Sequence, residues 1–243
     1  MNAVVKWLRQ LLLTVLILLC AAWASGEGAQ WLLRWRAQRL LTDTRSLEVN
    51  RSGWSDAQAV IKKWGRSGTS TGSCTSEACN YRIDLVQTLP PMLVGHPDEN
   101  ANNSLPRLMD HIGLRSAAAR AGFTVEYGVV TSKWFGEQVT LPIRDWTQPS
   151  DYVPYLSVSS GETAKFRGRL GGAGTGHPHR AIQTSGLDMA ITFSPEEDSS
   201  EQMALLDFQF SCITQFRPCE RQAEILPEAT RLLQEQDQSP DTR

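Results

Sequence analysis

The chain has 243 residues, a formal net charge of −2, 41% hydrophobic residues, 18 glycines and 12 prolines. This length and composition suit one sizeable folded domain with an appendage, and they exclude wholesale disorder. Two of the 24 basic residues, Lys6 and Arg9, lie in residues 1–26, which contain no acid, so the rest of the chain holds 22 basic against 26 acidic residues. A net negative body has no general attraction for phosphate backbones, which argues against nucleic acid as a partner.

An apolar run over residues 11–24 follows the cationic flank and ends in Ala22-Trp23-Ala24. This order of positive flank, apolar run and small residues is typical of a secretory signal, and the last three residues match a cleavage site. The run has about 14 residues, whereas a membrane span needs about 20. Residues 7–8 and 25–29 extend it, so both a cleaved signal and a retained anchor stay open.

The residues after the run favour a retained anchor. Residues 31–41 predict an amphipathic helix. Its aromatic and basic side chains are typical membrane-interface anchors, since they lie beside an apolar run. We therefore expect contact with the membrane through residues 7–25 and a single-pass topology with the soluble domain outside the cytoplasm. If the segment is cleaved, the domain is secreted. The expected interface residues are Trp31, Arg34, Trp35, Arg36 and Arg39.

The five cysteines divide into one inside the apolar run, Cys20, and two close pairs. Behind an export signal, close even-numbered cysteines favour disulfides, although sequence alone leaves three connectivities open for four cysteines. A structural zinc site and unrelated free thiols are the alternatives, and the C-x4-C and C-x6-C spacings are looser than a zinc knuckle. The expected disulfide residues are Cys74, Cys79, Cys212 and Cys219.

The first elements of the domain are a short strand at Leu47–Val49 and a helix from Ser55. Ser55 and Gln58 match a capping box, and Gly65 is expected to end the helix in a left-handed conformation. Between them, the apolar positions follow helical spacing at Ala57, Val60, Ile61 and Trp64.

Residues 67–76 predict a loop, and the alternation at Tyr81, Ile83 and Leu85 predicts a half-buried strand. A long loop over 90–103 follows. A second helix is expected from Ser104, continuing through 117–121 and ending at Gly122. Its apolar stripe is Leu105, Leu108, Met109 and Ile112.

From Phe123 the apolar period changes to two, which predicts an antiparallel hairpin with its turn around residues 133–136. A weaker strand is expected at Tyr155–Ser159, then a glycine-rich loop over 161–179. Two more strands are expected at 187–193 and at 206–212. A helix over 220–236, interrupted at Pro227, closes the domain.

These elements predict an α+β fold. An N-terminal transmembrane or signal-anchor helix precedes one domain, whose antiparallel sheet is covered on one face by two or three helices. The expected organisation is an anchor with its juxtamembrane helix at 1–42, an exported domain at 43–236 and a flexible tail at 237–243.

Motifs for chemistry are weak. The glycine-rich segment 171–176 lacks the following helix of a phosphate loop. His177 and His179, with His96 or His111, are weak candidates for a metal site. We found no G-x-S-x-G elbow, H-E-x-x-H helix or C-x-x-C redox motif, so we expect no catalytic residues and no cofactor. Aromatic residues concentrate around Trp134 and Phe135, where sheet-covering or core roles are commoner than partner binding.

The sequence therefore favours a membrane-anchored, exported structural or interaction module without catalytic activity, whose protein partner it does not identify. Two alternatives stay open: a secreted hydrolase or metal-binding domain using His177 and His179, and a pilin-like assembly subunit. The second rests on an apolar helix that runs into an amphipathic one before a sheet. It lacks the glycine-aromatic processing site and the early glutamate of such subunits.

Overall fold

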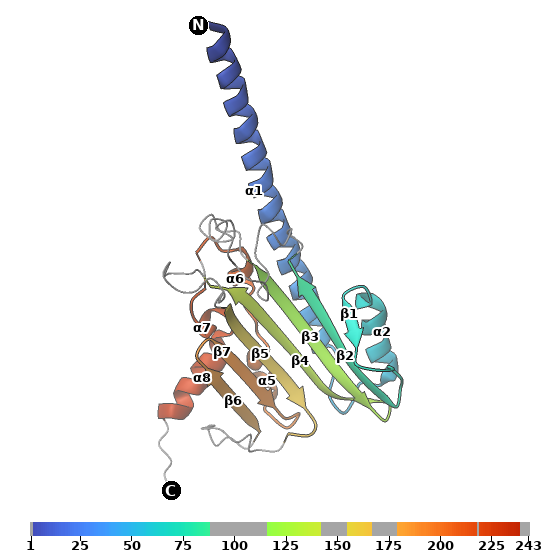
Figure 1. The fold of residues 1–243 in the computed structure, drawn as a ribbon. Coiled ribbons are helices and arrows are strands. Elements are labelled where there is room, and N and C mark those ends of the chain that lie inside the picture. Colours follow the sequence, from blue (N-terminus) through green and yellow to red (C-terminus); the bar gives the residue numbers. More distant parts are fainter. Residues whose placement is uncertain (1, 88–115, 142–154, 167–178, 218, 239–243) are drawn as a thin grey trace.

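The structure is a computed structural model, and it describes residues 2–87, 116–141, 155–166, 179–217 and 219–238 (Figure 1). One long helix leads into a seven-stranded sheet in the order β1-β2-β3-β4-β5-β7-β6. Every neighbouring pair is antiparallel except β5 and β7, which are parallel. The predicted α+β fold with an N-terminal apolar helix and a mainly antiparallel sheet is thus confirmed.

Helix α1 (Asn2–Arg45) is continuous through both predicted N-terminal segments. Its first half extends away from the domain, whereas its second half lies along the sheet (Figure 1). One side of that second half is buried, and burying each leucine there contributes about 2 kcal/mol. The buried side chains include Leu33, Ala37, Leu40 and Leu41. The helix therefore forms part of the hydrophobic core and also projects beyond it.

A turn joins α1 to α2 (Trp54–Trp64), which runs back beside α1 (Figure 1). The predicted strand at Leu47–Val49 is wrong: Leu47 and Val49 are buried, but the backbone turns there instead of pairing. The stripe predicted for α2 is confirmed, since Ala57, Val60 and Trp64 are buried and Ile61 packs against the core.

The predicted caps of α2 are wrong by one or two residues. Gly53 is the N-cap, and the Asp56 carboxylate accepts a hydrogen bond from the Gly53 N–H at 3.0 Å, so Ser55 and Gln58 do not form the box. Gly65 is right-handed, with φ −53°, because the chain continues through a further turn at this point. The segment predicted as a loop contains the short edge strand β1 (Gly68–Ser70).

Strands β2 (Ala78–Val86), β3 (Ala117–Glu126) and β4 (Val129–Thr140) form the centre of the sheet. The predicted β2 is confirmed by its alternating burial. The predicted extension of a helix through 117–121 is wrong, because these residues lie in β3. Tertiary context overrides the helix propensity of alanine here, since small side chains let α1 lie close to the sheet. The start of that predicted helix, and the loop over 90–103, lie outside the described residues.

The β3–β4 hairpin is confirmed, but its turn is not at 133–136. Tyr127 and Gly128 form a two-residue turn with φ of +53° and +81°, which matches the right-handed strand twist. Lys133 and Phe135 consequently lie inside β4, opposite Phe123 and Ala121. The sequence signal was missed because Tyr-Gly is an uncommon pair for this turn, which Asn-Gly and Asp-Gly usually form.

The second half of the sheet contains β5 (Tyr155–Thr163), β6 (Arg180–Ser185) and β7 (Asp188–Phe193). The strands predicted at 155–159 and 187–193 are confirmed, the first extending further than predicted. Strand β6 was missed because an edge strand is buried over few of its residues, and polar side chains predominate in it. Of the loop predicted over 161–179, residues 161–163 belong to β5 and 167–178 lie outside the described residues.

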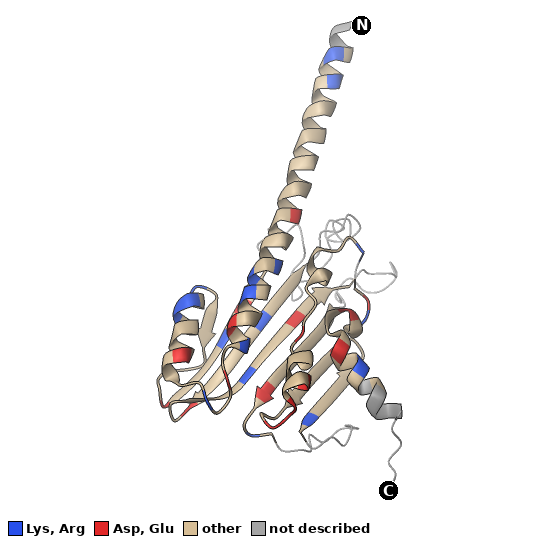
Figure 2. Ribbon diagram, turned by 180° about the vertical axis from the view of Figure 1, so that it is seen from behind, with Lys and Arg blue, Asp and Glu red and all other residues tan. Residues whose placement is uncertain are grey.

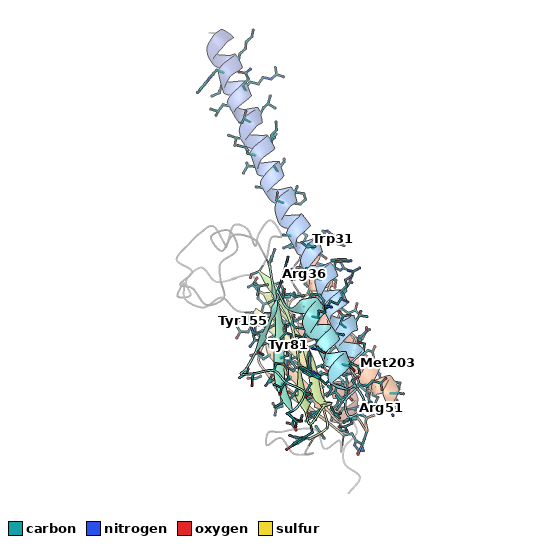
Figure 3. All side chains as sticks on the ribbon, turned by 90° about the vertical axis from the view of Figure 1, so that its right-hand side faces the viewer. Trp31, Arg36, Arg51, Tyr81, Tyr155 and Met203 are labelled. Atoms are coloured by element: carbon teal, nitrogen blue, oxygen red, sulfur yellow. A yellow bond between two sulfur atoms is a disulfide. The ribbon has the colours of Figure 1, made fainter. Side chains whose placement is uncertain are left out.

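Four short helices complete the layer on the α1 side of the sheet (Figure 3). They are α5 (Ser199–Leu205), α6 (Ser211–Thr214), α7 (Gln222–Ile225) and α8 (Pro227–Gln238). The predicted break at Pro227 is confirmed: α7 ends two residues earlier, and Pro227 begins α8, where its missing N–H costs nothing.

The strand predicted at 206–212 is wrong. Phe208 and Phe210 are buried and Asp207 and Gln209 exposed, as the alternation implied, but this segment crosses over the sheet instead of joining it. The rings of Phe208 and Phe210 pack edge-on against Phe135 of β4, with centroids 4.9 and 5.7 Å away. Alternating burial therefore identified the buried side chains correctly without identifying a strand.

Trp134 of β4 points to the face of the sheet opposite α1. Its neighbours there include two glycines, Gly122 of β3 and Gly161 of β5. A Cβ atom added to Gly122 would come within 2.5 Å of Trp134 Nε1 and 2.9 Å of the Tyr81 carbonyl oxygen. A Cβ atom added to Gly161 would lie 2.8 Å from Trp134 Cβ. Glycines on both neighbouring strands thus create the space that the half-buried indole occupies, while the adjacent Phe135 enters the core.

Substituting Gly122→Ala is expected to lower the free energy of unfolding by about 2 kcal/mol, because overpacking forces the indole or the backbone to shift. Thermal unfolding of the full chain in detergent, followed by near-ultraviolet circular dichroism, measures this effect. Gly28→Ala is the matched control, since a Cβ atom there meets nothing within 4 Å. Equal melting temperatures for both variants would contradict the role assigned to Gly122.

Candidate functional site

The junction between the projecting and the packed halves of α1 is the feature that most constrains what the protein can do. Residues 5–25 are all exposed, and their large apolar side chains are exposed by 46–66%. Among the described residues, α1 is the one helix long and apolar enough to cross a membrane. From Gly26 onward buried positions recur along the helix, so the transition from exposed apolar helix to packed helix occupies about one turn.

The residues expected at the membrane interface divide between two environments. Trp31 and Trp35 remain exposed, each beside an arginine: the Arg34 guanidinium lies 5.2 Å from the Trp31 ring and that of Arg39 4.0 Å from the Trp35 ring. Arg34 also donates a hydrogen bond to Thr214 Oγ1 in α6 at 2.9 Å. The amphipathic helix therefore uses its apolar side for the domain and presents a tryptophan-arginine side outward.

A cavity of about 530 Å³ lies where α1 ends, between α5 and the sheet. Its floor holds the buried ion pair of Lys133 and Glu162, with 3.1 Å between Nζ and Oε2. Lys133 Nζ also donates to the carbonyl oxygens of Leu47 at 2.5 Å and Arg45 at 3.4 Å. These three acceptors use the three hydrogens of the ammonium group, so Lys133 caps α1 and has no hydrogen left to offer a ligand.

Glu137 is a second buried titratable group, on β4 between Ala119 of β3 and Val158 of β5. Its side chain is 1% exposed, and neither carboxyl oxygen has a hydrogen-bond partner among the described residues. Burial raises the pKa of the Glu137 carboxyl well above its ordinary value, and the positive charge of Arg34 opposes this only in part. The protonated form is consequently the one that the core accommodates.

A third group of charges lies at the edge of the sheet. Arg180 of β6 pairs with Glu201 of α5 and, at 3.8 Å, with Glu197. Burial, a hydrogen bond that the protonated Glu197 carboxyl donates to Glu201, and the negative charge of Glu201 raise the pKa of Glu197 to about 6, while Arg180 lowers it. These ion pairs attach α5 to the sheet. They also compensate the charge of Arg180, which is why its side chain can be buried.

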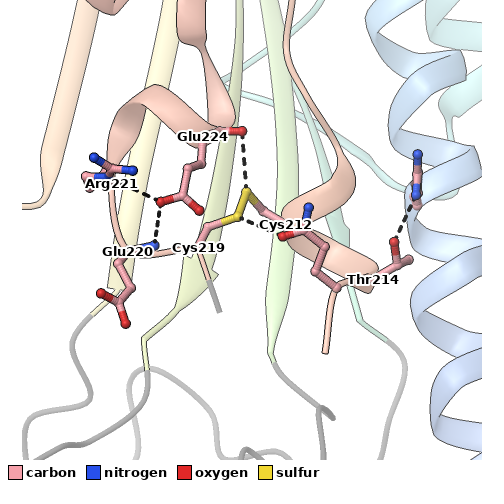
Figure 4. Close-up of a disulfide and its surroundings, with 8 residues drawn as sticks. Cys212, Thr214, Cys219, Glu220, Arg221 and Glu224 are labelled. Atoms are coloured by element: carbon pink, nitrogen blue, oxygen red, sulfur yellow. Dashed lines mark hydrogen bonds and ion pairs between the residues drawn. A yellow bond between two sulfur atoms is a disulfide. The ribbon is translucent and has the colours of Figure 1, made fainter. Parts of the chain in front are cut away.

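The four cysteines of the domain form the two sequence-local pairs. Cys74 lies at disulfide distance from Cys79, and Cys212 from Cys219, with Cα atoms 4.3 and 5.5 Å apart. The second pair is buried at the end of α6 (Figure 4), where Glu224 accepts a hydrogen bond from the Glu220 N–H. The two disulfides close the loops that precede β2 and α7. Cys20 lies apart from them, in the apolar half of α1.

The weak metal candidates do not form a site within the described part of the chain. His177 lies outside it. His179 Nδ1 lies 3.4 Å from Ser194 Oγ and 3.5 Å from Glu196 Oε2, which joins the start of β6 to the segment after β7. No group of three or more histidine, cysteine, aspartate or glutamate side chains suited to a metal ion occurs among the described residues.

No protein-family model, curated protein or solved structure matches the chain. The assignment of function therefore depends on the geometry of its own residues. Sequence reasoning missed Lys133, Glu137 and Glu162, which became visible only through the strand pairing. The signal available in the sequence was faint: a lysine and two glutamates fall in phase with the apolar positions of the strands beside them, where buried or functional charges occur.

Proposed function

We propose that the protein is a single-pass membrane protein whose exported α+β domain is a non-catalytic interaction module, held rigidly at the membrane surface by α1. The observation that carries this proposal is the continuity of α1, whose exposed apolar half runs without a break into the core of the domain. A flexible tether would leave the domain free to rotate. A helix fixed by buried leucines and capped by Lys133 instead gives the domain a defined orientation.

Oxidised cysteine pairs are part of this proposal, because disulfides persist outside the reducing cytoplasm. The orientation follows from them: residues 43–236 outside the cytoplasm and the N-terminus inside. Basic residues favour the cytoplasmic side, so Lys6 and Arg9 before the span agree with this orientation, whereas the arginines after it, Arg34, Arg36 and Arg39, compete with it. The orientation proposed here therefore depends on the oxidised cysteines.

Intact-mass thiol accounting on protein from native membranes tests the proposal. Alkylation in denaturant without reductant is expected to modify one thiol, Cys20, and alkylation after reduction all five. If the segment is cleaved after Ala24, the counts become zero and four, the mass lacks residues 1–24, and the domain is secreted. Modification of all five thiols without reduction would refute an oxidising location.

The assembly alternative has one observation in its favour, which is that the exposed apolar half of α1 offers a surface to other copies as well as to lipid. A photo-reactive amino acid at Leu12 or Leu16 distinguishes the two. Lipid adducts and monomers would support the anchor, whereas a ladder of multimers would support a pilin-like subunit. The hydrolase and metal-binding alternatives remain predictions, tested by whether bound zinc or copper is lost in His177→Ala/His179→Ala.

A further inference from the structure

A basic groove runs between α1 and α2, on the side of α1 that the domain leaves open. The cavity measures about 360 Å³ and five of its lining side chains are cationic. Figure 2 shows the basic residues of α1 below its apolar half and those of α2 beside them. We define the basic groove as Trp35, Arg36, Arg39, Lys62, Lys63, Trp64, Gly65, Arg66 and Ser67.

The positive charge of the basic groove is largely uncompensated. Asp43 is the acid that reaches this region among the described residues: it pairs with Lys63 at 2.7 Å and accepts a hydrogen bond from Trp64 Nε1 at 2.7 Å. Arg36 donates to the neutral Ser67 hydroxyl at 2.9 Å, and Arg39 stacks on Trp35. Arg39, Lys62 and Arg66 form no ion pair among the described residues, although acids outnumber bases in the chain as a whole.

The end of α2 does not by itself account for this accumulation. Lysines in the last turn favour the partial negative charge of a helix C-terminus, which equals about half an elementary charge and weakens within one turn. Lys62 and Lys63 therefore have a structural reason to be there. Arg36 and Arg39 belong to another helix, and Arg66 lies beyond the end of α2, so their clustering requires a further explanation.

The basic groove lies close to the point where α1 leaves the membrane, if residues 7–25 or 7–29 span it. The helical rise places Arg36 about 16 Å beyond Ser25 and about 10 Å beyond Ala29. The headgroup layer extends roughly 5–7 Å outside the hydrocarbon core, and spanning helices tilt by about 20° on average. Helix α2 runs back toward the span (Figure 1), so tilting α1 toward α2 moves the basic groove closer to the headgroups, and its long arginine and lysine side chains extend toward them.

We propose that the basic groove binds the phosphate of an anionic phospholipid headgroup and so fixes the direction in which α1 tilts. Arginine donates two parallel hydrogen bonds to phosphate oxygens, and lysine adds a compact charge. The exposed indole of Trp35 suits the boundary between headgroups and acyl chains. The proposal rests on the membrane anchoring proposed above and adds to it a lipid class and a site.

Native mass spectrometry of the full chain in non-ionic detergent tests this site, with phosphatidylglycerol or phosphatidylcholine added separately. Wild type is expected to bind phosphatidylglycerol at least about tenfold more tightly than phosphatidylcholine, since several basic residues near a surface together attract anionic lipids. The variant Arg39→Gln/Lys62→Gln/Arg66→Gln is expected to lose at least about tenfold in phosphatidylglycerol affinity and to keep its phosphatidylcholine affinity.

The matched control, Arg51→Gln/Lys165→Gln/Arg231→Gln, removes the same charge from exposed positions outside the basic groove. Equal losses in both variants, or no loss in either, would overturn the site. Displacement of phosphatidylglycerol by millimolar inorganic phosphate would overturn the lipid and assign the basic groove to a soluble anion. Flotation with phosphatidylcholine vesicles after a carbonate wash tests anchoring separately: wild type that fails to float refutes the anchor, whatever the lipid preference.

Discussion

Replacing Lys133 by methionine is expected to lower the free energy of unfolding by about 3–5 kcal/mol, the cost of leaving the partner of a buried ion pair without its counter-charge. The Glu162 side chain, which is 7% exposed, would then remain buried without its counter-charge. The carbonyl oxygens of Arg45 and Leu47 would also lose a donor, which loosens the end of α1. The change should therefore affect the attachment of the helix as well as total stability.

Thermal unfolding of the full chain in detergent should show a fall of roughly 10 °C, given about 2–4 °C for each kcal/mol in a domain of this size. Hydrogen exchange should reveal faster opening at the end of α1, which separates this effect from general destabilisation. The double variant Lys133→Met/Glu162→Leu is expected to recover most of the stability, since apolar replacement of a whole buried pair is often neutral. A single variant as stable as wild type would contradict the cap.

Hydrophobic periodicity was sufficient to predict the fold class and most of the central strands, because one covered face forces alternate burial on each strand. It failed where burial had another cause. Leu206 to Cys212 alternate because they cross over the sheet, and the residues of β3 that face α1, Ala117, Ala119 and Ala121, are small because a helix lies on them. The edge strands β1 and β6 were missed since few of their residues are buried.

The candidate site was predictable only where it is local in sequence. The cysteine pairs are separated by 5 and 7 residues, and the tryptophan-arginine segment is continuous in α1. The basic groove joins residues of α1 to residues about 25 positions later, and the pairing of Lys133 with Glu162 depends on the register of β4 and β5. Such contacts depend on topology, which a single sequence does not specify.

Glu137→Gln is expected to raise the free energy of unfolding by about 2 kcal/mol at pH 7.5, because a buried carboxylate without hydrogen-bond partners costs more than a neutral amide. The direction of this change in stability follows from the pKa of the Glu137 carboxyl, which is raised in the folded state. Below the ordinary pKa of 4.5 the carboxyl is protonated in both states and imposes no penalty. As the pH rises, the unfolded chain ionises first, so wild type loses up to about 1.4 kcal/mol per pH unit until the folded-state pKa is reached.

Melting temperatures of wild type and Glu137→Gln should therefore converge near pH 4 and separate as the pH rises toward 7.5. Glu197→Gln is the matched control: the pKa of Glu197 is raised only to about 6, so its difference from wild type should develop between pH 4.5 and 6 and then stay constant. A Glu137 difference that does not grow between pH 4.5 and 7.5 would contradict the raised pKa, since it would show that the carboxyl ionises alike in the folded and unfolded states. The positive charge of Arg34 would then balance burial, and Glu137 would be an ionised partner of α1 at pH 7.5.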